Sequence, residues 1–150
     1  VEVSTLAALS LNAAPCTHLL CPLLDARRGQ VYAGLYRIAD DGLPRAQCPD
    51  RISLLPDLLG ELPGEEIVFL GDGALRYEKQ IRDSLKGRAL LSTGPHHRLM
   101  ASSVGLIGTG RHRDGIIVDA STFAPRYLRL SEAEARYGHP SRNEDKKLTL

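Results

Sequence analysis

The chain has 150 residues, enough for one domain with a buried core. Its hydrophobic share of 43% and charged share of 25% are close to globular averages, which argues against disorder of the whole chain. The net charge is only +1 and aromatic residues make up 5%, which argues against an autonomous nucleic-acid-binding protein.

The cysteines and the hydropathy of the chain bear on its compartment. Cys16, Cys21 and Cys48 lack CxxC spacing, and their odd number argues against a disulfide framework or a zinc site. We interpret them as reduced thiols. No apolar run approaches the roughly 20 residues that span a bilayer, and no signal peptide is apparent. These features predict a cytoplasmic protein.

The first half of the chain predicts one helix and three meandering strands. They are expected over residues 5–14, 18–26, 30–38 and 45–52. Ser4 is a favourable N-cap for the helix. Pro22 cannot donate to a central ladder, so it should mark a bulge or the true start of its strand. The chain begins at Val1 without Met, and we therefore expect it to belong to a longer protein.

The second half alternates helices and strands. The expected elements are a short helix capped by Ser53, a strand at 67–70, a helix over 74–86, a strand at 88–92, and a helix after His97 that carries Met100, Val104 and Ile107. Strand–helix alternation after a meander implies a mixed sheet flanked by helices. We predict an α/β fold with a mixed five-stranded sheet, the order of ribonuclease H-like domains in the actin-like ATPase superfamily.

Four short segments carry a more specific pattern. They are VSTLAAL at 3–9, PLLDARRGQVY at 22–32, GDG at 71–73 and PRYLR at 125–129. In this order they resemble segments of the TsaB (YeaZ) family, which acts in the synthesis of threonylcarbamoyladenosine on tRNA. The hairpin motif at 22–32 is the most specific of the four. Ala7 and Gln30 depart from the glutamates usual in the family.

The resemblance implies two actin-like halves in tandem, of which only the C-terminal half is present here. It divides the chain into a helix that links from an N-terminal domain, a ribonuclease H-like C-terminal domain, and a polar tail expected to be disordered. These parts correspond to residues 1–14, 15–138 and 139–150.

The resemblance also implies a non-catalytic scaffold subunit of the bacterial machinery that forms N6-threonylcarbamoyladenosine in tRNA. The implied partners are the catalytic paralogue TsaD and the ATPase TsaE, with tRNA reached through the complex and a homodimer formed when TsaD is absent. TsaD binds a metal through two histidines four residues apart. Thr5 and Leu9 occupy those positions here, and a leucine has no donor atom. We therefore expect no catalytic residue, no metal and no cofactor.

The candidate site consists of Asp25, Arg27, Arg28, Arg126 and Arg129. One interpretation is structural: Asp25 accepts hydrogen bonds from backbone N–H groups of a hairpin turn or pairs with an arginine. The other is a basic patch that contacts tRNA phosphates without reading the base sequence.

Two further motifs have a structural and a functional interpretation. The segment 71–73 lies at a strand-to-helix turn, where it forms either a plain turn or a phosphate cradle. His96 and His97 are adjacent in a loop and face different ways, so we expect both to be exposed rather than to share a metal.

Three other function classes remain as alternatives. The first is an actin-like enzyme fragment, either a glycoprotease-type hydrolase or a sugar kinase, although no HExxH motif or nucleophile elbow is present. The second is a ribonuclease H-type nuclease that uses Asp25, Asp72 and Asp119, for which no glutamate partner is evident. The third is an RNA-binding module, which the near-neutral charge disfavours.

Overall fold

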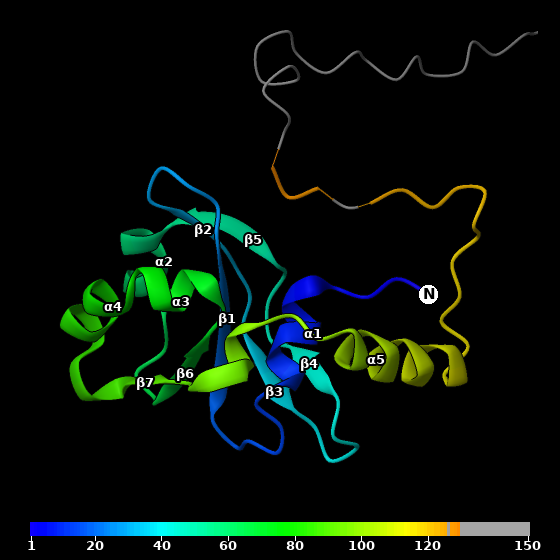
Figure 1. Cartoon of the computed structure of the whole chain (residues 1–150), viewed down its shortest axis with the longest axis horizontal. Helices are drawn as coiled ribbons and strands as arrows, with labels where there is room; N and C mark the ends of the chain where they lie inside the picture. The colour runs from blue at the N-terminus through cyan, green and yellow to red at the C-terminus, as the bar shows by residue number, and fades with distance from the viewer. Residues whose placement is uncertain (126, 130–150) are drawn as a thin grey trace, which may run out of the picture.

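The computed structural model describes residues 1–125 and 127–129. Figure 1 shows a sheet flanked by helices. In chain order the elements are α1 (Thr5–Leu11), β1 (Leu19–Asp25), β2 (Gln30–Ala33), β3 (Tyr36–Ile38), β4 (Pro44–Ala46), β5 (Arg51–Leu54), α2 (Leu55–Glu61), β6 (Ile67–Leu70), α3 (Asp72–Arg76), α4 (Glu78–Leu85), β7 (Ala89–Leu91) and α5 (Ala101–Arg113). The expected polar tail at 139–150 and the last residues of the expected domain lie outside the described part.

The seven β-strands form one sheet, in which β2 and β3 lie end to end, as do β5 and β4. β2 and β3 run one after the other antiparallel to β1, and β5 and β4 pair antiparallel with β2 and β3 respectively. On its other side β1 pairs in parallel with β6, and β6 pairs in parallel with β7. The order across the sheet is therefore β4/β5, β3/β2, β1, β6, β7. This arrangement confirms the predicted mixed sheet, but the sheet has seven strands and not five, because the strands predicted at 30–38 and 45–52 are each split in two.

The gap between β2 and β3 explains how β1 tolerates a proline. Pro22 lies in the middle of β1 and opposite Leu70 of β6, so it is not the start of the strand. On the other side β1 pairs with β3 at Leu20 and with β2 only from Leu23 onward. Pro22 therefore falls between two ladders, where a missing N–H costs no hydrogen bond to β2 or β3. The register is the same in both ladders, so Pro22 marks an interruption of the pairing, and both expected alternatives, a bulge and a strand start, are wrong.

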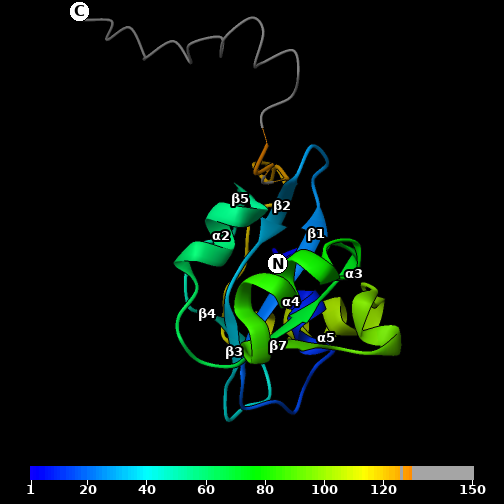
Figure 2. The same cartoon turned by 90° about the vertical axis from the view of Figure 1, so that its left-hand side faces the viewer.

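Two apolar cores lie on opposite faces of the sheet. Figure 1 and Figure 2 show α2, α3 and α4 on one face and α1 with α5 on the other. The first core is centred on Phe69, with Leu23 and Ile81 beside it. The second joins Leu9 of α1 to Ile107 of α5 across β1 and β6. Each fully buried side chain of this size contributes about 1.5–3 kcal/mol, so α1 belongs to the packed unit.

Two local predictions differ from the structure. Ser53 lies in β5 and does not cap α2, whose N-cap is Leu54 without a side-chain hydrogen bond. The helix expected over 74–86 is two helices, α3 and α4, which meet at Tyr77. None of the helices in the described residues is long and apolar enough to cross a membrane.

The helix α5 buries little apolar surface. Ile107 is buried, but Val104 is 37% exposed and Met100, the N-cap, is 41% exposed. Its glycines bring other elements close instead. A Cβ on Gly108 would contact Val1, and a Cβ on Gly110 would lie 2.7 Å from Leu43.

Candidate functional site

The candidate site forms at the tip of the β1–β2 hairpin, which projects at one end of the molecule (Figures 1 and 2). The turn closes through hydrogen bonds from Ala26 N to Gln30 O (2.9 Å) and from Gln30 N to Arg27 O (2.9 Å). Arg27 and Arg28 are exposed and have φ angles of 64° and 52°, followed by Gly29 at 75°. For a residue with a Cβ this left-handed conformation costs of order 1–2 kcal/mol.

Asp25 holds the base of this turn. Its Oδ1 accepts hydrogen bonds from Arg27 N (3.0 Å) and from the Tyr77 hydroxyl (3.0 Å), and its Oδ2 lies 3.4 Å from Arg76 Nη1. The Arg76 guanidinium also lies over the Tyr77 ring, 5.7 Å from its centroid. The Asp25 side chain is only 16% exposed. Asp25 therefore makes both kinds of contact expected of a structural turn residue.

Arg129, far from the hairpin in the sequence, contacts the hairpin turn. Its Nη1 donates to Ala26 O at 2.8 Å, and its Nη2 donates to Gln30 Oε1 at 3.4 Å. The structure thus brings Asp25, Arg27, Arg28 and Arg129 together, and it adds Arg76, which sequence reasoning missed. The remaining candidate, Arg126, lies outside the described residues.

The turn at 71–73 is explained by close packing against β1. Gly71 has a φ of 101°, and an added Cβ would overlap the Leu23 carbonyl oxygen and lie 2.9 Å from Leu9 Cδ2. A Cβ on Gly73 would lie 3.0 Å from the same carbonyl. Glycine is needed at both positions because α3 passes directly over the end of β1. Asp72 between them accepts a hydrogen bond from Asp25 N at 3.1 Å.

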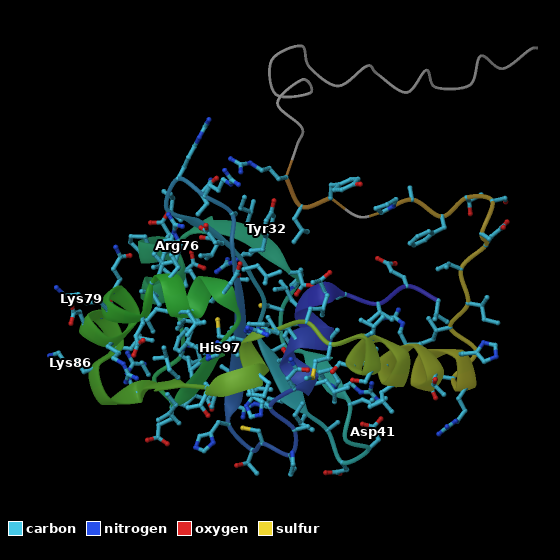
Figure 3. The ribbon with its side chains drawn as sticks, in the orientation of Figure 1. Tyr32, Asp41, Arg76, Lys79, Lys86 and His97 are labelled. Carbon is cyan, nitrogen blue, oxygen red and sulfur yellow. The ribbon has the colours of Figure 1, made fainter. Side chains whose placement is uncertain are left out.

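His97 is a core residue, contrary to the expectation that both histidines are exposed. It is 8% exposed and lies at the centre of the molecule (Figure 3). Its Nε2 lies 2.7 Å from Ser92 O, which can only accept, so Nε2 carries the proton. Its Nδ1 then accepts the Gly71 N–H at 3.1 Å. The ring thus fixes the backbone of the glycine turn.

We expect His97→Ala to lower the free energy of unfolding by about 1–3 kcal/mol, because it leaves the buried Gly71 N–H and the Ser92 carbonyl without their partner. Urea unfolding at pH 8 followed by circular dichroism measures the change. His112→Ala, at an exposed position of α5, is the control and should change stability by less than about 0.5 kcal/mol. Equal losses in the two variants would contradict the assigned role of His97.

A second polar cluster ties α1 to the meander, and no sequence pattern pointed to it. Asp50 accepts hydrogen bonds from the Ser4 hydroxyl (2.5 Å) and from the Tyr36 hydroxyl (2.5 Å). Burial raises the pKa of the Tyr36 phenol above its ordinary value, and the hydrogen bond to Asp50 acts in the same direction. Gly34 makes room for the cluster, because a Cβ there would overlap Asp50 and Tyr36.

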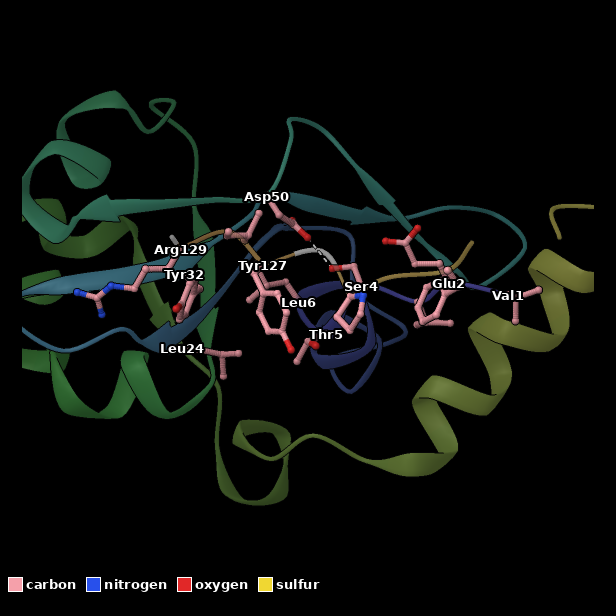
Figure 4. Close-up of a pocket in the computed structure, with 14 residues that line it drawn as sticks. Val1, Glu2, Ser4, Thr5, Leu6, Leu24, Tyr32, Asp50, Tyr127 and Arg129 are labelled. Atoms are coloured by element: carbon pink, nitrogen blue, oxygen red, sulfur yellow. Dashed lines mark hydrogen bonds between the residues drawn. The ribbon is translucent and has the colours of Figure 1, made fainter. Parts of the chain in front are cut away.

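A cleft of about 490 Å³ runs from this cluster to the hairpin (Figure 4). Its wall includes Leu24 and Tyr32 of the hairpin strands and Thr5 at the start of α1. Tyr127 and Arg129 line it from the C-terminal side. Aromatic rings and a guanidinium therefore surround one opening next to the arginine turn.

Thr5 and Leu9, the positions that the sequence resemblance relates to a metal-binding histidine pair, lie on α1. Thr5 is exposed at the first residue of the helix, whereas Leu9 is fully buried in the core against α5 and β1. Among residues 1–125 and 127–129, no three His, Cys, Asp or Glu side chains gather as a metal site. All three cysteines are free, and burial raises the pKa of the Cys21 thiol.

The third carboxylate of the nuclease alternative has a local role. Asp119 accepts two hydrogen bonds from Ser121, one from its N–H and one from its hydroxyl, each at 2.8 Å. These bonds lower the pKa of Asp119. Asp25 and Asp72 are joined by a hydrogen bond, and Asp119 is not part of a metal-binding group with them.

Comparison with solved structures defines the class of fold. One solved chain, an uncharacterised protein with similarity to the peptidase YeaZ from Pseudomonas aeruginosa, superposes with a TM-score of 0.68 at 22% identity, covering 85% of this chain and 57% of that one. YeaZ from Pseudomonas aeruginosa superposes with a TM-score of 0.64 at 22% identity, covering 83% and 58%. The chain has the ribonuclease H-like α/β fold of these proteins.

Sequence comparison then gives the related family. No protein-family model matches the chain. Over 137 residues it is 34% identical to the tRNA threonylcarbamoyladenosine biosynthesis protein TsaB of Bacillus subtilis (strain 168), covering 90% of this chain and 58% of that protein. The chain is therefore similar to the TsaB (YeaZ) family, as its motifs predicted. It spans a little more than half the length of the relatives that it matches.

Proposed function

We propose that this chain serves as a non-catalytic scaffold in the formation of N6-threonylcarbamoyladenosine in tRNA, in the cytoplasm. The observation that carries the proposal is its 34% identity over 137 residues to a TsaB protein named for this pathway. The partners we propose are a TsaD-type catalytic subunit and a TsaE-type ATPase, with a homodimer when TsaD is absent. Within the chain, we propose residues 1–14 as a link to a further domain.

The geometry of α1 supports the absence of a catalytic role. In the resemblance to TsaD, Thr5 and Leu9 replace two metal-binding histidines four residues apart. The Leu9 side chain is fully buried and belongs to the core that holds α1 against the sheet. A ligand at this position would have to leave that core, which supports a packing role for this helix in place of metal binding.

The experiment is a chimera that places the 137 matching residues of this chain into Bacillus subtilis TsaB in a strain depleted of its own TsaB. We expect tRNA hydrolysates analysed by mass spectrometry to contain threonylcarbamoyladenosine again, and TsaD to co-purify with the chimera. The control is the same chimera with Gly71→Ala, which should not restore the nucleoside because it cannot fold normally.

Two outcomes would overturn the proposal. The first is a chimera that accumulates in folded form but neither restores the modified nucleoside nor retains TsaD. The second is transfer of the threonylcarbamoyl group to tRNA by the chimera without TsaD, which would make it the enzyme and not a scaffold.

A further inference from the structure

We propose that the β1–β2 hairpin and the cleft beside it form an RNA-binding surface, with the arginines on backbone phosphates and an unpaired base in the cleft. The inference rests on the proposed function, because tRNA is the nucleic acid that this function supplies. It goes further by naming the surface, the chemical groups that it contacts and the type of contact.

Four guanidinium groups lie around this turn. Arg27 and Arg28 form its exposed tip, Arg76 is anchored on Asp25, and Arg129 is anchored on Ala26 O and Gln30. Arginine presents several N–H donors in a plane that matches the oxygens of a phosphate. A patch of this kind can attract a polyanion locally although the net charge of the chain is only +1.

Two carboxylates next to the turn, Asp25 and Asp72, are engaged in holding the hairpin. Asp25 accepts hydrogen bonds from Arg27 N and from the Tyr77 hydroxyl and forms an ion pair with Arg76. Its side chain is 16% exposed. Asp72 accepts a hydrogen bond from the N–H of Asp25. These two acids accept hydrogen bonds from the backbone at the base of the turn, and Arg27 and Arg28 form its exposed tip.

The cleft favours RNA over an acidic protein as the partner. Arg129 belongs both to the hairpin and to the wall of the cleft of about 490 Å³, so the phosphate-binding groups and the opening adjoin each other. Tyr32 and Tyr127 line that opening, and Tyr127 is 82% exposed (Figure 4). Unpaired RNA bases stack on exposed aromatic side chains, whereas an acidic peptide gains little from them.

The backbone conformation of the turn indicates whether its arginines serve binding or folding. Arg27 and Arg28 occupy left-handed conformations that asparagine and glycine adopt more easily. A residue chosen only to close this turn would be asparagine or glycine, so we infer that the arginines serve a contact at the expense of local stability. Arg27→Asn/Arg28→Asn should therefore keep the fold and remove the contact.

The test measures fluorescence anisotropy of a labelled, transcribed tRNA with the full chain between about 50 and 200 mM salt. We expect micromolar binding, and about tenfold weaker binding by Arg27→Asn/Arg28→Asn at the lowest salt. The slope of log K against log salt should become shallower by roughly 1.4–1.8, corresponding to two lost phosphate contacts. The melting temperature of the variant should be equal to or higher than that of the unaltered chain.

The matched control is Lys79→Gln/Lys86→Gln, which removes the same charge from α4 and its C-terminal end, away from the hairpin tip (Figure 3). We expect it to leave the affinity within about twofold and the salt slope unchanged. Equal weakening by both double variants would overturn the proposal, since binding would then follow net charge alone. No binding by the unaltered chain at about 100 µM would also overturn it.

An excess of unlabelled single-stranded RNA should displace the labelled tRNA, whereas poly-glutamate of equal charge should not. Equal displacement by both would overturn the choice of RNA.

Failure of the RNA surface can be distinguished from failure of the proposed function. A chimera that restores modification while the hairpin variant binds tRNA normally would refute only the RNA surface. Hairpin-dependent tRNA binding by a chain whose chimera restores nothing would refute only the scaffold role.

Discussion

Gly71→Ala is expected to lower the free energy of unfolding by more than about 3 kcal/mol, a large part of the 5–15 kcal/mol typical of a domain. Two costs combine. The φ of 101° at Gly71 lies where side chains are rarely tolerated, and the new Cβ would overlap the Leu23 carbonyl oxygen. Both obstacles are backbone, so a side-chain rotation cannot relieve them. Moving the turn away would also break the hydrogen bond from Gly71 N to His97.

The measurement is urea unfolding of the full chain, and the control is Gly60→Ala. Gly60 lies in α2, and nothing lies within 4 Å of its Cβ position. Alanine there should leave stability unchanged or raise it by about 0.4–1 kcal/mol, because it restricts the unfolded chain without strain in the fold. A Gly71→Ala variant as stable as the Gly60→Ala variant would show that α3 does not press on β1 as the structure has it.

Phe69→Ala is expected to be the most damaging truncation in the core, with a loss of about 3–5 kcal/mol in the free energy of unfolding. Phe69 is fully buried in β6, between helices on one face and the central strands. Its neighbours include fixed parts of the sheet, so the cavity cannot collapse completely.

The chain has two phenylalanines, and the second is the matched control. Phe123 is 49% exposed in the wall of the cleft, so Phe123→Ala should cost less than about 1 kcal/mol. Chemical unfolding of the two variants under one condition gives the comparison. Similar losses from both would mean that the segment after α5 is part of the folding core, contrary to its exposure.

The order of elements and the specific hairpin were accessible from the sequence because they depend on local signals. Alternating and continuous apolar runs predicted β1, β2 and β6, and the Arg-Arg-Gly turn between charged and apolar residues predicted the hairpin. The irregularity at Pro22 was also predictable, since the missing N–H is a property of the residue itself. Only the register of the sheet shows that the proline lies in the gap between the ladders to β2 and β3.

Other features depend on residues far apart in the chain, and local patterns cannot reveal them. His97 looked like an exposed loop residue, but the turn at Gly71 supplies its hydrogen-bond partner 26 positions away. Ser4 was recognised as an N-cap, yet its bond to Asp50 joins α1 to the meander across 46 positions.

The sequence by itself determined the fold class, the family resemblance and the arginine pair of the turn, because periodicity and short motifs are set by neighbours along the chain. Tertiary structure alone decided that Arg129 and Arg76 join that pair, that Asp25 is engaged in holding the turn, and that a cleft opens beside it. The physical reason is that a binding surface is an assembly of side chains from distant segments, and packing of the sheet and its helices fixes their positions.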